Sequence, residues 1–410
     1  MRLLYDIHCH TMTLARPAIG RYVDAFLKGG FESLYSQVAY SGRLLPELAL
    51  KGGEYGRNML AVMENDPASM IAMMEDDLSG AYPVEGVVRD GIIGETGLSL
   101  LGENWDAWLV CPLMMDFGAR AVGAEVYYST PPHKSVEEAV RETLSGVSGY
   151  RRARPDGKIV VRPFLGIDPG ARGAAATELT LSRYFAGYSR HKAAGLSSFR
   201  SAGRWKGDPL RPLRASFAGV KLYPPLGFDP WPGDRAALDA TVLLYRFCER
   251  RQIPIVVHCD DQGYRTIPFA ELARLTAPER WGPVLEAFPD LIVDFAHFGE
   301  QYLARGDAKG GWTREIMDLM RRYPGVYADV AFNGCDPSYW QRLKRMLESL
   351  DGPTADTVRK RLLFGSDFVV SLVRSRSYLD YVREFANGPL DLGLKLAMMG
   401  GNPERFLFGT

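Results

Sequence analysis

The 410-residue sequence predicts an α/β fold of the (β/α)8 TIM barrel type, with long insertions after the first and third strands. Two observations support this prediction. Eight short, nearly continuous apolar runs alternate with stretches of helical periodicity, as expected for parallel strands that are buried on both faces. Several of these runs end in residues that can do chemistry, and the carboxyl ends of barrel strands are where active sites form. The eight runs are residues 3–9, 108–117, 159–167, 217–223, 253–259, 291–297, 326–332 and 362–368.

Amphipathic helices are expected between these strands. The clearest amino-terminal signal is Ser135, which is followed by glutamates in what would be the first helical turn. The other stretches carry apolar residues at helical spacing, which indicates one face packed on the strands. The expected helices cover residues 135–144, 235–250, 314–322 and 338–350.

Two stretches, residues 11–106 and 177–216, are too long to be simple connections and are expected to be insertions in a single domain covering 1–410. The first contains a helical stretch near 56–77 that is rich in methionine and acids. Eight arginines and lysines and only one acid, Asp208, lie between residues 179 and 219. Such insertions often form the rim of an active site, where a basic stretch could attract an anionic substrate. The alternative is that it forms a solvated surface.

The composition limits the partners of the protein. Lysine plus arginine and aspartate plus glutamate both number 49, so the net charge is zero and neither nucleic acid nor a membrane is expected as a partner. Five scattered cysteines without a CxxC pair favour a reducing compartment. With no recognisable signal peptide and no apolar run of 18 residues, we expect a cytoplasmic protein that acts on a small molecule. The aromatic and methionine content of the first insertion is compatible with a homodimer.

Four of the six histidines stand at the carboxyl ends of predicted strands. His8 and His10 are two residues apart on the first strand, so they share one face. His258 ends the fifth strand, His297 ends the sixth, and Asp367 ends the eighth. Imidazoles with a carboxylate suit zinc and other divalent metals. Because these residues are far apart in sequence, only a closed barrel would bring them to one metal site.

These residues resemble the motifs of the amidohydrolase superfamily, in particular of its type 2 branch. The similarity includes the segment 6–10 (DIHCH), the histidines of strands five and six, and Asp367. It extends to 219–230 (GVKLYPPLGFDP) and to the ending 400–409 (GGNPERFLFG). Many members of the superfamily carry an amino-terminal β-sandwich. Only seven residues precede His8, so the resemblance favours the branch without that domain.

The resemblance implies a metal-dependent hydrolase. His8, His10, His258 and Asp367 would hold a divalent ion, with zinc preferred, that activates water to attack an amide, ester or lactone carbonyl. Asp367 would accept the proton of that water and return it to the leaving group. His297 would either complete a second metal site or polarise the substrate carbonyl.

Three further residues are candidates on the neighbouring strands. Lys221 ends the fourth strand, where binuclear relatives carry a lysine converted to a carbamate that bridges two metals. The resemblance therefore implies one ion, or two if Lys221 is carboxylated; as a plain ammonium, Lys221 would instead pair with a carboxylate of the site or of the substrate. Tyr223 and Arg162 are predicted to point inward and contact the substrate.

Two other functions remain open. Type 2 members also include decarboxylases and hydratases of small carboxylic acids. If this protein has such an activity, Lys221 or Arg162 would bind the substrate anion. A barrel that binds a ligand or a metal without catalysis is the third interpretation. The complete set of acid, base and metal-ligating groups argues against it, because a structural zinc site does not need them.

Overall fold

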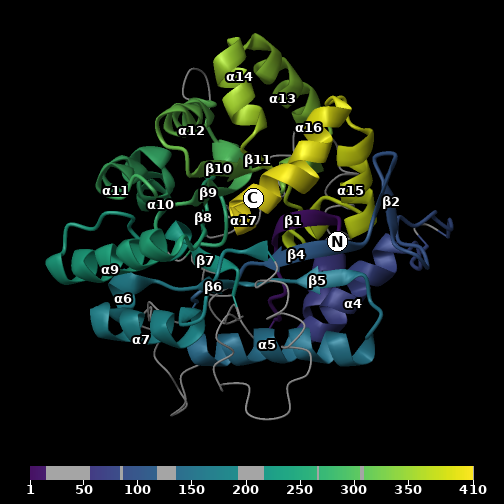
Figure 1. Cartoon of the computed structure of the whole chain (residues 1–410), viewed down its shortest axis with the longest axis horizontal. Coiled ribbons are helices and arrows are strands. Elements are labelled where there is room, and N and C mark those ends of the chain that lie inside the picture. The colour runs from purple at the N-terminus through teal and green to yellow at the C-terminus, as the bar shows by residue number, and fades with distance from the viewer. Residues whose placement is uncertain are drawn as a thin grey trace.

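In the computed structural model, parallel strands occupy the centre of the molecule and helices surround them (Figure 1). The α/β class predicted from the sequence is therefore confirmed, and each of the eight predicted runs contains a strand. The structure describes residues 1–14, 56–83, 86–117, 135–192, 217–265, 267–304 and 309–409.

Nine parallel strands form two sheets that are linked by isolated bridges. One bridge joins Cys9 to Phe368, and the other joins Leu113 to Phe164. The three-stranded sheet contains β1 (Leu3–Cys9), β4 (Ala107–Pro112) and β5 (Ile159–Val161). The six-stranded sheet contains β6 (Phe164–Gly166), β7 (Gly219–Leu222), β8 (Ile255–Val257), β9 (Val293–Phe295), β10 (Val326–Asp329) and β11 (Leu362–Leu363).

The third predicted strand, residues 159–167, is wrong as a single element, because it divides into β5 and β6. Ile159 of β5 lies opposite Trp108 of β4, whereas Phe164 of β6 lies opposite Gly219 of β7. Pro163 stands between the two halves and has no N–H to donate to a strand ladder. One continuous apolar run therefore contributes to two different sheets.

The four helices expected from periodicity are confirmed, with longer bounds in three cases. Ser135 caps its helix as predicted: its hydroxyl accepts from the Glu138 N–H and the Glu138 carboxylate accepts from the Ser135 N–H, which completes a capping box. The helices are α5 (Val136–Ala153), α9 (Arg235–Arg251), α12 (Gly311–Arg322) and α13 (Ser338–Ser349).

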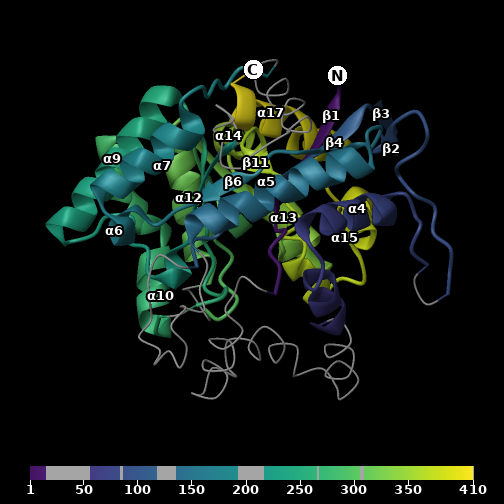
Figure 2. The same ribbon diagram turned by 90° about the horizontal axis from the view of Figure 1, so that it is seen from below.

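Further α-helices belong to the outer layer (Figure 2). They are α4 (Pro67–Leu78), α6 (Pro169–Arg172), α7 (Ala174–Phe185), α10 (Phe269–Thr276), α11 (Gly282–Ala287), α14 (Gly352–Arg359), α15 (Tyr378–Asn387), α16 (Leu392–Leu396) and α17 (Asn402–Phe408). The last three, α15 to α17, follow β11 and form the carboxyl-terminal segment.

Parts of the two predicted insertions have regular structure. The first contains α4, as expected, and also an antiparallel hairpin of β2 (Leu98–Leu100) and β3 (Glu103–Trp105), which was not expected. The second was predicted to begin at residue 177, but α7 continues to Phe185 and packs against α9. Most of the basic stretch, residues 193–216, lies outside the described residues.

The core is formed by apolar side chains of the strands and of the inner faces of the helices, such as Val110, Val256 and Leu319. Buried polar side chains gather instead where the parallel strands end. Among the described residues, no helix combines the length and the apolar character that crossing a membrane requires.

Candidate metal centre

Five polar side chains meet at the carboxyl ends of the parallel strands. One comes from β1, and four come from the ends of strands of the six-stranded sheet. His8 lies on β1 and Asp329 ends β10, while His258, His297 and Asp367 follow β8, β9 and β11. All five are buried, with at most 6% of their surface exposed. The parallel arrangement explains the meeting, because it directs the last residues of all these strands to the same end.

One part of this group is centred on Asp367. Its Oδ1 atom lies 3.1 Å from Nε2 of His10 and 3.5 Å from Nε2 of His8. The three ligating atoms lie within 4.8 Å of one another, a spacing that allows them to bind one ion. These are three of the four residues that the resemblance assigned to the metal.

The second part contains His258, His297 and Asp260. Nε2 of His297 lies 3.2 Å from Nδ1 of His258, and Nε2 of His258 lies 3.0 Å from Oδ1 of Asp260. The His297 ring centroid is 4.9 Å from the centroids of both His8 and His258. The predicted ligand His258 therefore lies in a group adjoining that of Asp367, with His297 between the two.

Three histidines are held in the same way, by a hydrogen bond from Nδ1. His10 donates to the carbonyl of Leu113 at 2.9 Å, and His297 donates to the carbonyl of Ala331 at 2.9 Å. His8 donates to Oδ2 of Asp329 at 2.8 Å. In a neutral imidazole whose Nδ1 carries the proton, Nε2 keeps its lone pair. The three Nε2 atoms are therefore available to a cation.

Asp329 connects three of the strands around this group. While its Oδ2 accepts from His8, its Oδ1 accepts from the backbone N–H groups of His297 at 3.0 Å and Ala331 at 2.9 Å. The pKa of Asp329 is lowered, because the attraction of His8 and His297 outweighs the opposing effect of burial. Asp329 is therefore a carboxylate that orients His8.

The sequence analysis missed Asp329 and did not include Asp260 among the site residues. Asp329 ends β10, but it stands in the middle of the predicted run 326–332, so the run-end position that singled out the histidines did not mark it. Asp260 follows His258 by two residues, so alternation directs it to the same side. A search for acids as well as histidines just after the predicted runs finds Asp260 but not Asp329.

Lys221 lies in the same group, as expected, at the end of β7. It is 1% exposed, and within the described part of the chain its Nζ atom has no hydrogen-bond partner. Burial lowers the pKa of Lys221 to about 8, although Asp329, Asp367, Asp294 and Asp260 favour the charged form. The ammonium thus lies among carboxylates without being bonded to them.

Asp294 of β9 contributes a further buried carboxyl, with 0% exposure. Burial raises the pKa of Asp294 well above its usual range, and the neighbouring Asp329 carboxylate raises it further. A protonated Asp294 removes one negative charge from the interior. The acids that remain ionised in this group are then Asp260, Asp329 and Asp367.

Tyr223 and Arg162, the two predicted substrate contacts, lie in different surroundings. The Tyr223 ring is 4.9 Å from that of His258, and its hydroxyl accepts from the N–H of Tyr264 at 3.0 Å. Arg162 lies over the ring of Phe408 at 5.5 Å, with Tyr188 and Tyr5 as electrostatic neighbours. Tyr223 therefore adjoins the histidines, whereas the described contacts of Arg162 are with another group of residues.

The histidines differ in their affinity for a proton. Burial lowers the pKa of His8 to about 4, despite the attraction of Asp329. Burial also lowers the pKa of His258. For His297, burial acts in the same direction, but Asp260, Asp367 and Asp329 together outweigh it and raise the pKa. Of the three rings of His8, His258 and His297, that of His297 therefore binds a proton most readily.

The loops after β8 and β9 are tied together above this group. The Asp261 carboxylate accepts from the N–H groups of Tyr302 at 2.7 Å, Leu303 at 2.8 Å and Ala304 at 3.2 Å. Gly263 approaches the site closely, because a Cβ atom there would lie 2.8 Å from the Tyr223 hydroxyl and 2.9 Å from Nε2 of His258. Its φ of +95° also favours glycine. The loop after β8 therefore encloses His258.

The chemistry of these donors fits a divalent cation. His258 donates from Nε2 to Asp260, so its Nδ1 presents a lone pair to Nε2 of His297 at 3.2 Å. His297 also presents a lone pair there when its proton is on Nδ1. Two facing lone pairs are stabilised by a positive charge between them, which either a proton on His297 or a divalent cation supplies. Anchored imidazoles with nearby carboxylates are the ligands that zinc and related metals prefer.

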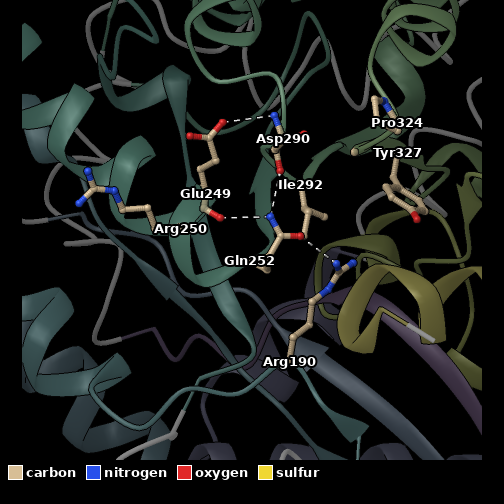
Figure 3. Close-up of a pocket in the computed structure, with 9 residues that line it drawn as sticks. Arg190, Glu249, Arg250, Gln252, Asp290, Ile292, Pro324 and Tyr327 are labelled. Atoms are coloured by element: carbon tan, nitrogen blue, oxygen red, sulfur yellow. Dashed lines mark hydrogen bonds between the residues drawn. The ribbon is translucent and has the colours of Figure 1, made fainter.

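A separate pocket of about 570 Å³ lies at the opposite ends of the strands (Figure 3). Ile292 and Gly325, which precede β9 and β10, line it, together with Arg190 and Gln252. Arg190 donates to Oε1 of Gln252 at 3.4 Å and to the carbonyls of Arg405 and Phe406. Arg190 thus links its own segment to Gln252 and to the carboxyl-terminal helix α17. No residue of the histidine group lines this pocket.

Solved structures with a similar arrangement are enzymes of several kinds. They include 5-carboxyvanillate decarboxylase from Novosphingobium aromaticivorans complexed with manganese, at 12% identity and a TM-score of 0.47, covering 99% of this chain and 96% of that one. Another is 4-oxalomesaconate hydratase from Rhodopseudomonas palustris, at 13% identity and a TM-score of 0.46, covering 98% and 95%. A third is a probable 2-pyrone-4,6-dicarboxylic acid hydrolase from Acinetobacter baumannii, at 12% identity and a TM-score of 0.45, covering 99% of both chains. Similarities of this size assign no activity to the chain.

Comparison of the sequence with family models identifies the family of the protein, which the structural similarities do not. No protein with a curated function matches it. The family model described as Amidohydrolase matches residues 131–409, about two thirds of the chain, including three strand-end site residues, His258, His297 and Asp367. The protein therefore belongs to the type 2 amidohydrolase family, as the sequence motifs indicated.

Proposed function

We propose that the protein is a metal-dependent hydrolase of a small molecule with an amide, ester or lactone carbonyl. The observation that supports this proposal most directly is the convergence of His8, His10, His258 and His297 with Asp367 in one buried group. Three of these histidines are anchored through Nδ1, so their Nε2 atoms are oriented before any ligand binds. Such prior orientation is what a catalytic metal site requires.

His8, His10 and Asp367 would hold the ion, and His258 would complete the set from the adjoining part of the group. A divalent cation, for which we propose zinc, supplies Lewis-acid activation of water and of the substrate carbonyl when it is bound there. The closed barrel predicted from the sequence, a single domain over 1–410, is the architecture that we propose for holding these residues together; the bridges of Cys9 with Phe368 and of Leu113 with Phe164 support it.

Asp367 would accept the proton of the attacking water and return it to the leaving group. The neighbouring rings of His10 and His8 lower the pKa of Asp367 against the opposing effect of burial, so Asp367 is ionised and able to accept a proton at neutral pH. His297, which lies between His8 and His258, would polarise the substrate carbonyl. Tyr223, beside His258, would contact the substrate.

A decarboxylase or hydratase of a small carboxylic acid is the second candidate, and the position of Lys221 favours it. A buried ammonium that has no hydrogen-bond partner within the described residues is suited to bind a substrate carboxylate. If Lys221 instead carries a carbamate, it would serve a second ion. The metal-to-chain ratio distinguishes these two uses of the lysine.

The test is elemental analysis of the purified protein, followed by assays on esters, lactones, amides and small carboxylic acids with detection of released CO₂. We expect one equivalent of metal and carbonyl hydrolysis that is lost on chelation and restored by zinc. Two equivalents would favour the carboxylated Lys221. Release of CO₂ would replace the hydrolase by the decarboxylase, and a protein without metal or activity would contradict both.

A further inference from the structure

A buried hydrogen-bond network underlies the junction between β1 and the segment that follows β11. Asp6, which is 0% exposed, lies on β1 two residues before His8. Its carboxylate accepts four hydrogen bonds. The donors are the N–H of His8 at 3.2 Å, the N–H and hydroxyl of Ser366 at 3.0 and 2.5 Å, and the hydroxyl of Tyr378 at 2.7 Å.

The network reaches both neighbours of Asp367 in the chain. The Ser366 hydroxyl donates to Asp6 and at the same time accepts from the N–H of Phe368 at 3.0 Å. The N–H of Asp367 itself donates to the carbonyl of His8 at 2.7 Å. The backbone on each side of Asp367 is therefore fixed relative to β1.

Asp367 needs such support because its backbone is in an unfavourable conformation. Its φ is 56°, in the left-handed region that residues other than glycine rarely adopt. The packing around it leaves little freedom, since a Cβ atom at Gly365 would lie 2.7 Å from Cβ of His8. Loss of the Ser366 hydroxyl would release one side of this turn.

We propose that Asp6 is a positioning residue of the metal centre, acting through Ser366 on the backbone of Asp367 and directly on that of His8. This inference rests on the proposed function, because it assumes that these two residues bind the ion. Asp6 would not touch the metal or the substrate. Its contribution would be to hold Asp367 and Nε2 of His8 at the separation that binds the ion tightly.

Cobalt binding tests the inference without any assay of turnover. The probe is Co²⁺, added to the metal-free full-length protein, and the readouts are the dissociation constant and the absorption bands that report the ligand geometry. For Ser366→Ala we expect about 10-fold or greater weakening of Co²⁺ binding and a change in the band pattern. Asp6→Asn should have a larger effect of the same kind.

Ser371→Ala is the matched control. Ser371 is also 0% exposed and lies five residues further along, and its hydroxyl has no hydrogen-bond partner among the described residues. We expect this variant to bind Co²⁺ like the wild type, with the same spectrum. Thermal unfolding of the metal-free variants separates a loss of stability from a loss of geometry.

The outcomes are distinguishable even if Asp6→Asn does not fold. A wild-type protein that binds Co²⁺ and a Ser366→Ala variant with the same spectrum and affinity would overturn this inference alone. Equal effects of Ser366→Ala and Ser371→Ala on Co²⁺ binding would also overturn it. A wild-type protein that binds no Co²⁺ would contradict the proposed function and, with it, the inference.

Discussion

The two ends of the parallel strands use buried polar groups in opposite ways. At the carboxyl ends, imidazoles and carboxylates face one another, and the ammonium of Lys221 has no hydrogen-bond partner within the described residues. At the amino ends, Arg190 and Gln252 bond mainly to backbone carbonyls, which their hydrogen bonds satisfy (Figure 3). The carboxyl-end group thus brings potential metal ligands together, whereas the amino-end group mainly joins neighbouring segments.

Under the proposed function, the pocket of known volume and the catalytic groups lie at opposite ends of the strands. The pocket of about 570 Å³ adjoins polar groups that join the start of strands to neighbouring segments and thereby contribute to stability. The histidine group instead concentrates charge at a cost in stability, which is typical of functional sites. Substitutions at the two ends should therefore affect different properties.

The largest effect is expected for Asp367→Asn. The amide keeps the size of the side chain but cannot accept the proton of water, so kcat should fall by about 100- to 10,000-fold with little change in the melting temperature. Steady-state kinetics and calorimetry on the same preparation measure both. Glu249→Gln, the corresponding neutralisation at the amino ends, should leave kcat unchanged. Full activity of Asp367→Asn would eliminate the proton-transfer role of Asp367.

The next effect is expected for Asp329→Asn. Neutralising this residue weakens the hydrogen bond that holds Nδ1 of His8, so metal affinity should fall about 10- to 100-fold. Competition with a chromophoric chelator measures the affinity. If metal binding by Asp329→Asn equals that of the wild type, the anchoring of His8 does not contribute to the site.

A smaller effect, on stability alone, is expected for Gln252→Ala at the amino ends. The side chain of Gln252 donates to the carbonyls of Glu249 at 3.1 Å and Asp290 at 3.3 Å, and accepts from Arg190. Losing these bonds should lower the free energy of unfolding by about 1–2 kcal/mol, measured by urea titration, while activity stays constant. A loss of activity that exceeds the loss of folded protein would contradict this separation between the two ends.

A last effect, on the pH dependence of stability, is expected at the carboxyl ends. Burial raises the pKa of Asp116, in the segment after β4, to about 7, although Arg172 lowers it. An acid with a raised pKa in the folded state stabilises the protein fully below its unfolded pKa, near 3.8, and this contribution is lost as the pH rises to about 7. Asp116→Asn should therefore flatten the decline in melting temperature between about pH 4 and pH 7. The exposed Asp290, changed to asparagine, is the control and should not alter the profile.

Much of the framework was predictable, because burial on both faces leaves a direct pattern in the sequence. Eight apolar runs marked the strands, and Ser135 marked the start of α5. The division of residues 159–167 was not predicted, although Pro163 was visible, because apolar character does not report which neighbour a strand pairs with. The hairpin of β2 and β3 is too short for a clear periodicity.

The site was predictable to the extent that rare residues marked it. Histidines are few in this chain, so four of them at strand ends were conspicuous, and the structure brings them together with Asp367 and Lys221. Aspartates are common, so Asp329 and Asp260 did not stand out, although they orient His8 and His258. Arg162 was assigned by alternation, which the break at Pro163 interrupts.

The three hydrogen bonds that Asp261 accepts from residues 302–304 have a consequence for how the specificity of such an enzyme can change. Because the two loops share one carboxylate, replacing one of them alters the support of the other. A grafted loop after β8 that has no acid at the position of Asp261 would leave three amides without this acceptor. The two loops are therefore best exchanged together.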